Sequence, residues 1–292
     1  MEPACRYSLA TAPVRADDHR MRLIVSTDPD EIVALVEPLL AADPVRNTVF
    51  SSVIAGLRGP DADGWCAHPV GHPGVLAVRS QRHTPVTVTA GWRDIAQLAA
   101  AVSALVPVTA IGGPAPTVEA LASALGELGI SATRQMSERL FRLDELAEPG
   151  HVAGVARLAS LDDLTPLVEW YKSFATDVFG RPPEGFDATD LVHQGIAKSG
   201  VWLWSDPAGG PRSMAARRPA AFGVARIGPV YTPPDSRGRG YASAVTAAAT
   251  RDILREGATP VLYTDLANPT SNKIYQRLGY YPVQDRTHVG FS

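Results

Sequence analysis

Apolar and polar positions follow regular periods along the first half of the chain. Residues 28–45 carry Ile32, Leu35, Val36 and Leu39 at helical spacing, on one face of a predicted helix. Residues 84–91 alternate between apolar and polar side chains, as in a strand with one buried face. The elements predicted here are a helix from Asp28, strands over 74–80 and 84–91, a helix over 92–105, a strand over 107–113, a helix from Pro114 to about Leu128 and a strand over 133–146.

The second half begins after the polar Glu-Pro-Gly at 148–150, which predicts a domain boundary between about 145 and 152. Ser160, with Asp163 three residues later, approaches a capping box at the start of a helix. The apolar stripe of that helix is Leu164, Leu167, Val168, Tyr171 and Phe174. The predicted elements are a strand over 154–160, the capped helix, a loop over 177–187, a helix over 191–200, strands over 201–206, 212–219 and 220–234, a helix over 240–256, a strand over 259–265, a helix over 269–278 and a strand over 280–285.

The two halves end with the same order of elements: strand, helix, strand, helix, strand. This order runs from residue 84 in the first half and from residue 220 in the second. We interpret it as an internal duplication of architecture with little residue identity.

Composition limits the class of protein. The 292 residues suggest about two domains, and a hydrophobic content of 45% is ample for a core. The net charge of −3 argues against a nucleic-acid partner. The two cysteines, Cys5 and Cys66, cannot form a disulfide framework, which favours the cytoplasm. Residues 1–20 are expected to be a disordered tail without a secretory apolar core, and no stretch predicts a membrane span.

Residues 230–253, VYTPPDSRGRGYASAVTAAATRDI, combine a strand end, a glycine-rich turn with two arginines, and a helix start. A helix N-terminus has unpaired backbone N–H groups and a positive dipole end, which together favour an anion. Gly238 and Gly240 let the backbone curl around that anion, and Arg237 and Arg239 add positive charge. A pyrophosphate fits this arrangement. The alternative is a solvated, flexible turn.

Other phosphate-binding motifs fit this turn less well. A P-loop needs Lys and then Ser or Thr after its last glycine, but Tyr241 and Ala242 follow here. A dinucleotide fingerprint needs a third glycine, but Ser243 holds that position.

The segment Arg237-Gly238-Arg239-Gly240-Tyr241-Ala242 resembles the acyl-CoA pyrophosphate loop of the GNAT superfamily of N-acyltransferases. Residues 228–234 resemble its fourth strand and residues 268–280 its second cofactor motif. The resemblance covers about 152–288 and also extends to tandem-GNAT proteins and the C-terminal domain of glycine N-acyltransferases. It implies an α/β fold of two GNAT-like domains in tandem, each with a mixed, mostly antiparallel sheet flanked by helices. We expect a degenerate domain over 21–146 and an acetyl-CoA-binding N-acetyltransferase domain over 152–292.

The resemblance also implies roles for individual residues. Backbone groups of Val230, Tyr231 and Thr232 would meet the pantetheine arm, and the oxyanion would be met by a backbone N–H of the same stretch. Amides from Gly238 to Ser243 would hold the pyrophosphate of acetyl-CoA or another short acyl-CoA. Asn268 and Asn272 would face the pantetheine, and Tyr275 would stand beside the thioester sulfur.

The residues themselves support this role for Tyr275. Asn268 suits a helix N-cap, and Asn268, Asn272 and Tyr275 then share one helical face. Ile274 and Leu278 are expected to point the other way, into the core. An ordinary tyrosine pKa of about 10 suits the protonation of a departing thiolate, so Tyr275 is the predicted general acid. The alternative is a plain, partly buried tyrosine.

The general base and the acceptor site are less defined. Glu169 is the preferred base, while Asp177, Glu184 and His193 are alternatives in the segment that lines the acceptor site in this superfamily. Trp170 and Phe179 are candidates for the acceptor pocket. His68 and His72 predict a turn rather than a metal site, because no third ligand accompanies them.

The first half has no counterpart of the glycine-rich loop. Gly91 alone cannot form an anion nest, and Asp94 would repel a phosphate. We therefore expect this half to have lost acyl-CoA binding and to supply a pocket wall or a dimer surface.

The expected activity is transfer of an acetyl group from acetyl-CoA to a primary amine of a small molecule, by direct attack on the thioester. The alternatives are a protein N-terminal or lysine acetyltransferase and a non-catalytic acyl-CoA-binding regulator. The expected oligomeric state is a monomer or homodimer, with no metal, nucleic-acid or membrane partner.

Overall fold

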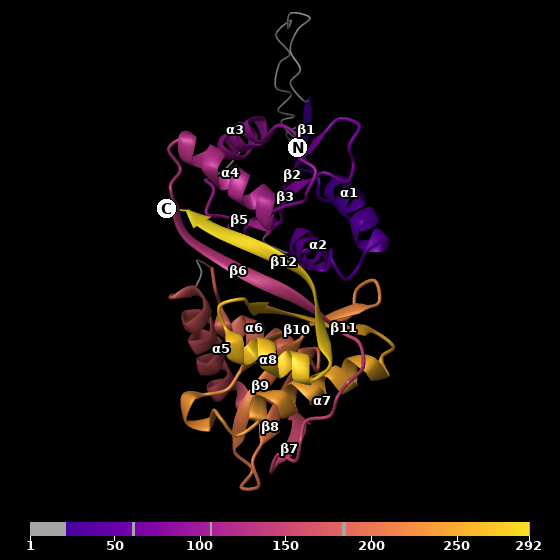
Figure 1. Cartoon of the computed structure of the whole chain (residues 1–292), viewed down its shortest axis with the longest axis vertical. Helices are drawn as coiled ribbons and strands as arrows, with labels where there is room; N and C mark the ends of the chain where they lie inside the picture. Colours follow the sequence, from indigo (N-terminus) through magenta and orange to yellow (C-terminus); the bar gives the residue numbers. More distant parts are fainter. Residues whose placement is uncertain (1–21, 60–61, 106, 183–184, 292) are drawn as a thin grey trace, which may run out of the picture.

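The computed structural model describes residues 22–59, 62–105, 107–182 and 185–291, so the expected tail over 1–20 lies outside the described residues. A single twelve-stranded sheet runs through both halves of the chain (Figure 1). Its strand order is β1-β2-β3-β4-β5-β12-β6-β11-β10-β9-β8-β7. This order is symmetric about the β12–β6 pair in the centre, which matches the duplication predicted from the sequence.

The strands are β1 Leu23–Ser26, β2 Trp65–Pro69, β3 Ala77–Arg79, β4 Val86–Val88, β5 Ala110–Pro114, β6 Ala132–Leu143, β7 Val155–Leu158, β8 Val201–Ser205, β9 Pro211–Arg217, β10 Val224–Tyr231, β11 Thr259–Asp265 and β12 Tyr280–Phe291. The α-helices are α1 Pro29–Ala42, α2 Val49–Leu57, α3 Ile95–Leu105, α4 Ala115–Glu127, α5 Leu164–Phe179, α6 Ala188–Ala197, α7 Tyr241–Arg255 and α8 Pro269–Arg277. Two of the described strand pairs are parallel, β4 with β5 and β10 with β11, and they occupy equivalent positions in the two halves. The sheet is therefore mixed and mostly antiparallel, as expected.

The two halves exchange their last strands. β6, from the first half, pairs with β11 and β12 of the second half. β12, at the end of the chain, pairs along its second edge with β5 of the first half. The prediction for 280–285 was therefore too short: the strand continues to Phe291 because both of its edges are paired. Sequence patterns also missed β1, β2 and α2.

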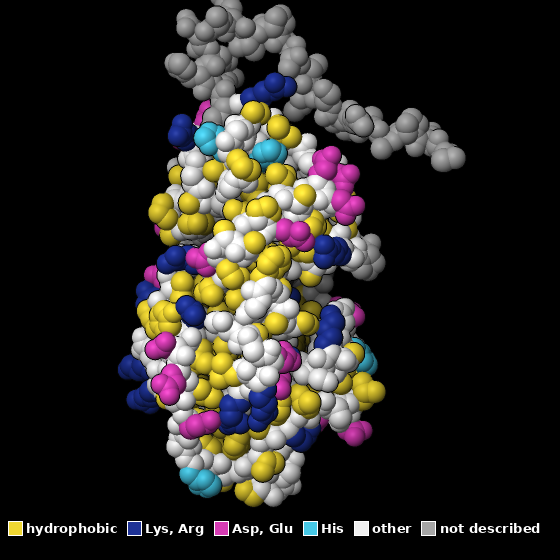
Figure 2. Space-filling view, turned by 90° about the vertical axis from the view of Figure 1, so that its right-hand side faces the viewer, with side chains coloured by type: hydrophobic (Ala, Val, Ile, Leu, Met, Phe, Trp, Pro, Cys, Tyr) yellow, Lys and Arg dark blue, Asp and Glu magenta, His cyan; other side chains and the backbone are white. Residues whose placement is uncertain are grey.

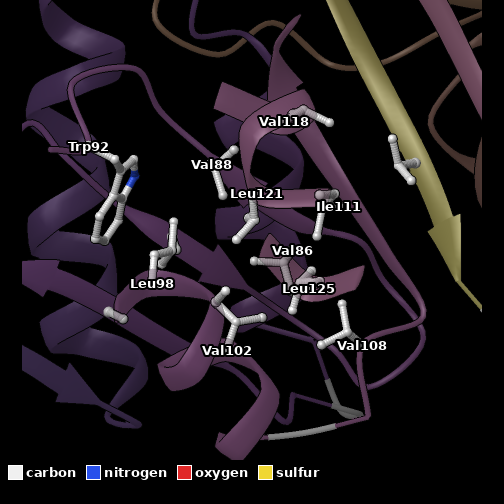
Figure 3. Close-up of a cluster of buried hydrophobic side chains, with 14 of the residues drawn as sticks. Val86, Val88, Trp92, Leu98, Val102, Val108, Ile111, Val118, Leu121 and Leu125 are labelled. Atoms are coloured by element: carbon white, nitrogen blue, oxygen red, sulfur yellow. The ribbon is translucent and has the colours of Figure 1, made fainter. Parts of the chain in front are cut away.

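The first half has a core of its own on each side of the sheet. Helices α3 and α4 pack on one face, where Val86, Leu98, Val102, Ile111 and Leu121 are buried (Figure 3). A second cluster joins α1 and α2 to strand residues such as Leu76 and Val78. Asp28 caps α1, because its carboxylate accepts hydrogen bonds from the backbone N–H groups of Asp30 and Glu31 in the first turn.

Opposite faces of the second half are covered by different helix pairs. Helices α7 and α8 pack over Phe141, Ala225 and Leu262, and the small residues of α7 allow a close approach to the sheet. Helices α5 and α6 cover the other face, where Tyr171 and Met214 are buried. The expected capping box of Ser160 and Asp163 is present ahead of α5. Among the described residues, no helix is both long and apolar enough to cross a membrane.

Candidate functional site

Strands β10 and β11 separate toward their C-terminal ends. Their parallel pairing begins at Val224 with Thr259 and ends at Ile227 with Leu262. Beyond that point β10 remains paired with β9 through Tyr231, after a shift in register, while β11 remains paired with β6 through Asp265. The sheet therefore opens between the parallel strands β10 and β11. Helix α7 follows β10 and helix α8 follows β11, and both helices begin at this open end. Val230 and Tyr231, at the end of β10, and Thr232, which follows them, lie at this opening.

The glycine-rich turn folds as the sequence predicted. Gly238 and Gly240 have φ angles of 78° and 82°, in the left-handed region that favours glycine. A Cβ at Gly240 would lie 3.0 Å from Val152 Cγ2, so a larger residue would also crowd its neighbour. Gly240 forms the N-cap of α7, and its carbonyl accepts from the N–H of Ala244.

The turn leaves a run of free backbone donors. Within the described part of the chain, none of the N–H groups from Gly238 to Ser243 donates a hydrogen bond. The first turn of α7 contains no acidic residue, so no carboxylate of the helix itself competes for these donors. Unpaired N–H groups and the positive dipole end of a fifteen-residue helix together form an anion site with the capacity for a diphosphate.

The equivalent position in the first half is closed. The Asp94 carboxylate accepts a hydrogen bond of 2.8 Å from the N–H of Gln97, in the first turn of α3. Asp94 therefore supplies the negative charge that the N-terminus of α3 attracts. This agrees with the expectation that the first half does not hold a phosphate.

The two arginines of the turn are not equivalent. Arg237 donates to the Thr232 carbonyl at 2.9 Å and to Asp177 of α5 at 3.1 Å. Its guanidinium also lies over the Tyr231 ring, 5.9 Å from the ring centroid. Arg237 thus ties the turn to α5 and β10, and Asp177 offsets much of its charge. Arg239 is exposed, so the positive charge expected from both arginines falls mainly on Arg239.

The two asparagines of α8 stabilise the turn between β11 and α8. Asn268 is the N-cap and its Oδ1 accepts from the N–H of Ser271 at 3.0 Å, as the sequence indicated. The side-chain amide of Asn272 donates to the carbonyls of Asp265 and Asn268. Asn272 Oδ1 is buried without a partner among the described residues, so Asn272 retains one free acceptor at the end of β11.

Tyr275 lies deeper than the sequence suggested. Its exposed fraction is 8%, and its ring packs against the rings of Phe141 and Tyr280. Leu278 and Ile274 lie in the core as expected, and Tyr275 belongs to the same apolar cluster. Burial raises the pKa of Tyr275 to about 12.

The residues predicted for the general base and the acceptor pocket lie in different surroundings. Trp170 is half-buried and its ring centroid lies 6.4 Å from that of Tyr231, beside the end of β10. Glu169 forms an ion pair with Lys172 at 3.0 Å, and both side chains are more than half exposed. This environment does not favour a general base. Phe179 is the last residue of α5, but its side chain lies outside the described residues, as does the whole of Glu184.

Sequence reasoning missed a polar cluster at the centre of the sheet. It consists of five residues from four strands, Glu138, Arg226, Tyr263, Arg286 and His288. The available signal was the presence of charged residues within stretches that otherwise read as strands. The sequence could not show that β6 and β12 bring them together.

Part of the sequence matches a family model, and the fold is similar to that of known acetyltransferase structures. The family model of FR47-like proteins matches residues 208–289, which contain the turn and α8. Two similar solved structures are a GCN5-related N-acetyltransferase from Sphaerobacter thermophilus (16% identity, 92% of this chain and 95% of that chain, TM-score 0.61) and a GNAT-family acetyltransferase from Colwellia psychrerythraea (15% identity, 93% and 100%, TM-score 0.54). A third is a tandem GNAT protein from the clavulanic acid biosynthesis pathway (13% identity, 92% and 98%, TM-score 0.52). No curated protein matches the chain.

These comparisons define the fold. The chain has a GNAT fold, built from two GNAT-like halves in tandem. The expected domain limits and the likeness to glycine N-acyltransferases stay predictions. Among the described residues, no group of three or more His, Cys, Asp or Glu side chains is arranged to hold a metal ion.

Proposed function

We propose that the protein is an acyl-CoA-dependent N-acyltransferase that transfers an acetyl group from acetyl-CoA to a primary amine of a small molecule. One observation carries the proposal: the free N–H groups of Gly238 to Ser243 stand at the start of α7, where β10 and β11 separate. Acetyl-CoA has a diphosphate for these donors and an extended arm that can lie along the open edge of β10. The FR47-like match over the same segment adds support.

The proposed reaction is direct transfer. The amine attacks the thioester carbonyl, and a backbone N–H near Val230 to Thr232 stabilises the oxyanion that forms. The carbon–sulfur bond then breaks, and Tyr275 protonates the departing CoA thiolate. The proton that the attacking nitrogen loses passes to solvent water, and the Tyr275 phenolate regains a proton from water. With a pKa of about 12, Tyr275 is fully protonated at neutral pH, as the role requires, but it is a weaker acid than an ordinary tyrosine. Cys66 is buried in the first half, so a cysteine acyl-enzyme is not part of the mechanism.

Tyr275→Phe tests the proposed acid. Turnover should fall by about a hundredfold, because a positioned general acid contributes on the order of 10²–10⁴ in rate. The dissociation constant of acetyl-CoA should change little, because the ring and its packing are retained. CoA thiol release in the presence of a panel of amines measures turnover, and calorimetry measures binding. Equal turnover in the variant would remove Tyr275 from the mechanism.

The pH dependence provides a second test of Tyr275. Because the folded pKa of about 12 exceeds the ordinary value of about 10, the protonated form persists through the physiological range. Activity should therefore show no loss from this acid between pH 7 and about pH 10. The contribution of Tyr275 to folding stability should be complete below about pH 10 and be lost as the pH rises toward 12. A pH–rate profile that falls near pH 8 in the wild type and not in Tyr275→Phe would contradict this account.

A further inference from the structure

The polar cluster at the centre of the sheet lies between the two halves. In the strand register, Glu138 of β6 is opposite Asp265 of β11 on one side and Arg286 of β12 on the other. Arg226 of β10 donates a hydrogen bond to Ser52 of α2, in the first half. The cluster is thus formed by strands of both halves and covered in part by α2. Figure 2 shows a recess in the surface between the upper and lower halves of the molecule.

This cluster carries more positive than negative charge. Glu138 accepts a hydrogen bond from His288 at 2.9 Å, and Arg286 lies 4.0 Å from the same carboxylate oxygen. Burial opposes the charged form of Glu138, but the hydrogen bond from His288 and the nearby arginines bring its pKa below the ordinary value. One carboxylate therefore serves several cationic partners. Arg226 has no carboxylate within 4.0 Å among the described residues, and a buried unpaired charge is costly.

Several donors in the cluster are buried without a partner. Arg286 is 4% exposed, yet its Nε and one Nη have no hydrogen-bond acceptor among the described residues. The Tyr263 hydroxyl is also buried without a partner, and the Arg226 guanidinium lies over the Tyr263 ring at 5.9 Å from its centroid. Buried donors are nearly always hydrogen-bonded, so an acceptor with several lone pairs is missing from this set. A carboxylate fits both the unpaired donors and the excess positive charge.

The position of the cluster relates it to the acyl-transfer site. Arg226 immediately precedes Ile227, and Tyr263 immediately follows Leu262, and these two neighbours form the last pair between β10 and β11. Arg226 and Tyr263 therefore flank the point at which the sheet opens. An anion held here would lie next to the space where the amine meets the thioester.

We propose that Arg226, Arg286 and Tyr263 bind the carboxylate of the acyl acceptor, which is therefore a small amine that also carries a carboxylate, such as an amino acid. This inference rests on the proposed acyltransferase function. It assigns substrate selection to residues from both halves and gives the first half a role in the site through α2, which contacts Arg226. Glu138, which is hydrogen-bonded to His288, lies 4.0 Å from Arg286 and helps to position it.

The test compares amino acids with their amides. CoA release from acetyl-CoA is measured with glycine, alanine and β-alanine and with the matched amides, which retain the amine and lack the carboxylate. The wild type should prefer the amino acids. Arg286→Gln and Tyr263→Phe should lower kcat/KM for the amino acids by about tenfold or more, because each removes a hydrogen bond to a charged group. Their kcat/KM for the amides should stay within about twofold.

Two controls separate ligand binding from folding. Tyr263→Phe removes a hydroxyl without a described partner, so its melting temperature should not fall even if the arginine variants are less stable. Arg139→Gln removes a partly exposed arginine that follows Glu138 on β6 and pairs with Asp285 of β12, and it should not change the preference. Preference for the amides, or an equal loss with both kinds of acceptor, would overturn the carboxylate site alone. CoA release with other primary amines but with none of these acceptors would also overturn the carboxylate site alone. No CoA release with any member of a broad panel of primary amines would overturn the proposed function.

Discussion

A Gly238→Glu variant is expected to lose acetyl-CoA binding, with the dissociation constant raised by at least about a hundredfold. The added carboxylate would stand among the donors that we assign to the diphosphate, and it would both repel the ligand and compete for the N–H groups. Gly238 is exposed, and a Cβ there would meet no heavy atom within 4 Å, so the only structural cost is the backbone strain of a side chain at a φ of 78°. Isothermal titration calorimetry with CoA measures the effect.

Gly257→Glu is the matched control for this variant. Gly257 follows the C-terminal end of the same helix, α7, and has a φ of 75° with no heavy atom near an added Cβ. The same substitution thus introduces the same charge and similar backbone strain far from the proposed site. It should bind CoA as the wild type does. If both variants lose binding, the effect is one of folding; if Gly238→Glu keeps one equivalent of CoA, the cofactor binds elsewhere, and the first half is then the next place to test.

Residues 152–292 expressed alone are expected not to fold. This fragment contains the proposed site but lacks β6, which pairs with β11 over Val261–Asp265 and with nearly the whole of β12. Without β6, β11 and β12 would each have an unpaired edge. The apolar cluster beneath α7 and α8 would also lose the side chains of Phe141 and Leu143. We expect an insoluble product or one without a cooperative thermal transition.

A longer fragment provides the comparison. Residues 130–292 retain β6 and leave only the β5 edge of β12 unpaired. This fragment should be more soluble and should show a thermal transition by circular dichroism. Co-expression of 1–150 with 152–292 should restore a complex through β6 and β12. Cooperative folding of 152–292 alone would show that the exchanged strands are not needed.

Local features of the site could be predicted because they depend on neighbouring residues. Gly238 and Gly240 have the left-handed conformations that the turn requires, and Asn268 caps α8 as its position before Pro269 indicated. The Asp94 carboxylate, which was expected to repel a phosphate, accepts a hydrogen bond from the N–H of Gln97 three residues later. In each case the partner lies within a few residues in the chain.

Long-range features could not be predicted in this way. Glu138 and His288 are 150 positions apart and meet only because β6 and β12 are neighbours in the sheet. The burial of Tyr275 depends in the same way on Phe141, which belongs to the first half of the chain. The pairing of Glu169 with Lys172 is local, but the orientation of α5 that exposes both residues is not. The pattern of apolar and polar residues in β6 or β12 does not show which strand of the other half will pair with it.

The central claim is that the free N–H groups at the start of α7 bind the diphosphate of an acyl-CoA. A crystal structure of the full chain with CoA tests it most directly. The predicted result is one CoA molecule per chain, with diphosphate oxygens within about 3 Å of backbone nitrogens between Gly238 and Ser243 and the thiol end between β10 and β11. A diphosphate bound at any other place, with these nitrogens facing only solvent, would contradict the claim.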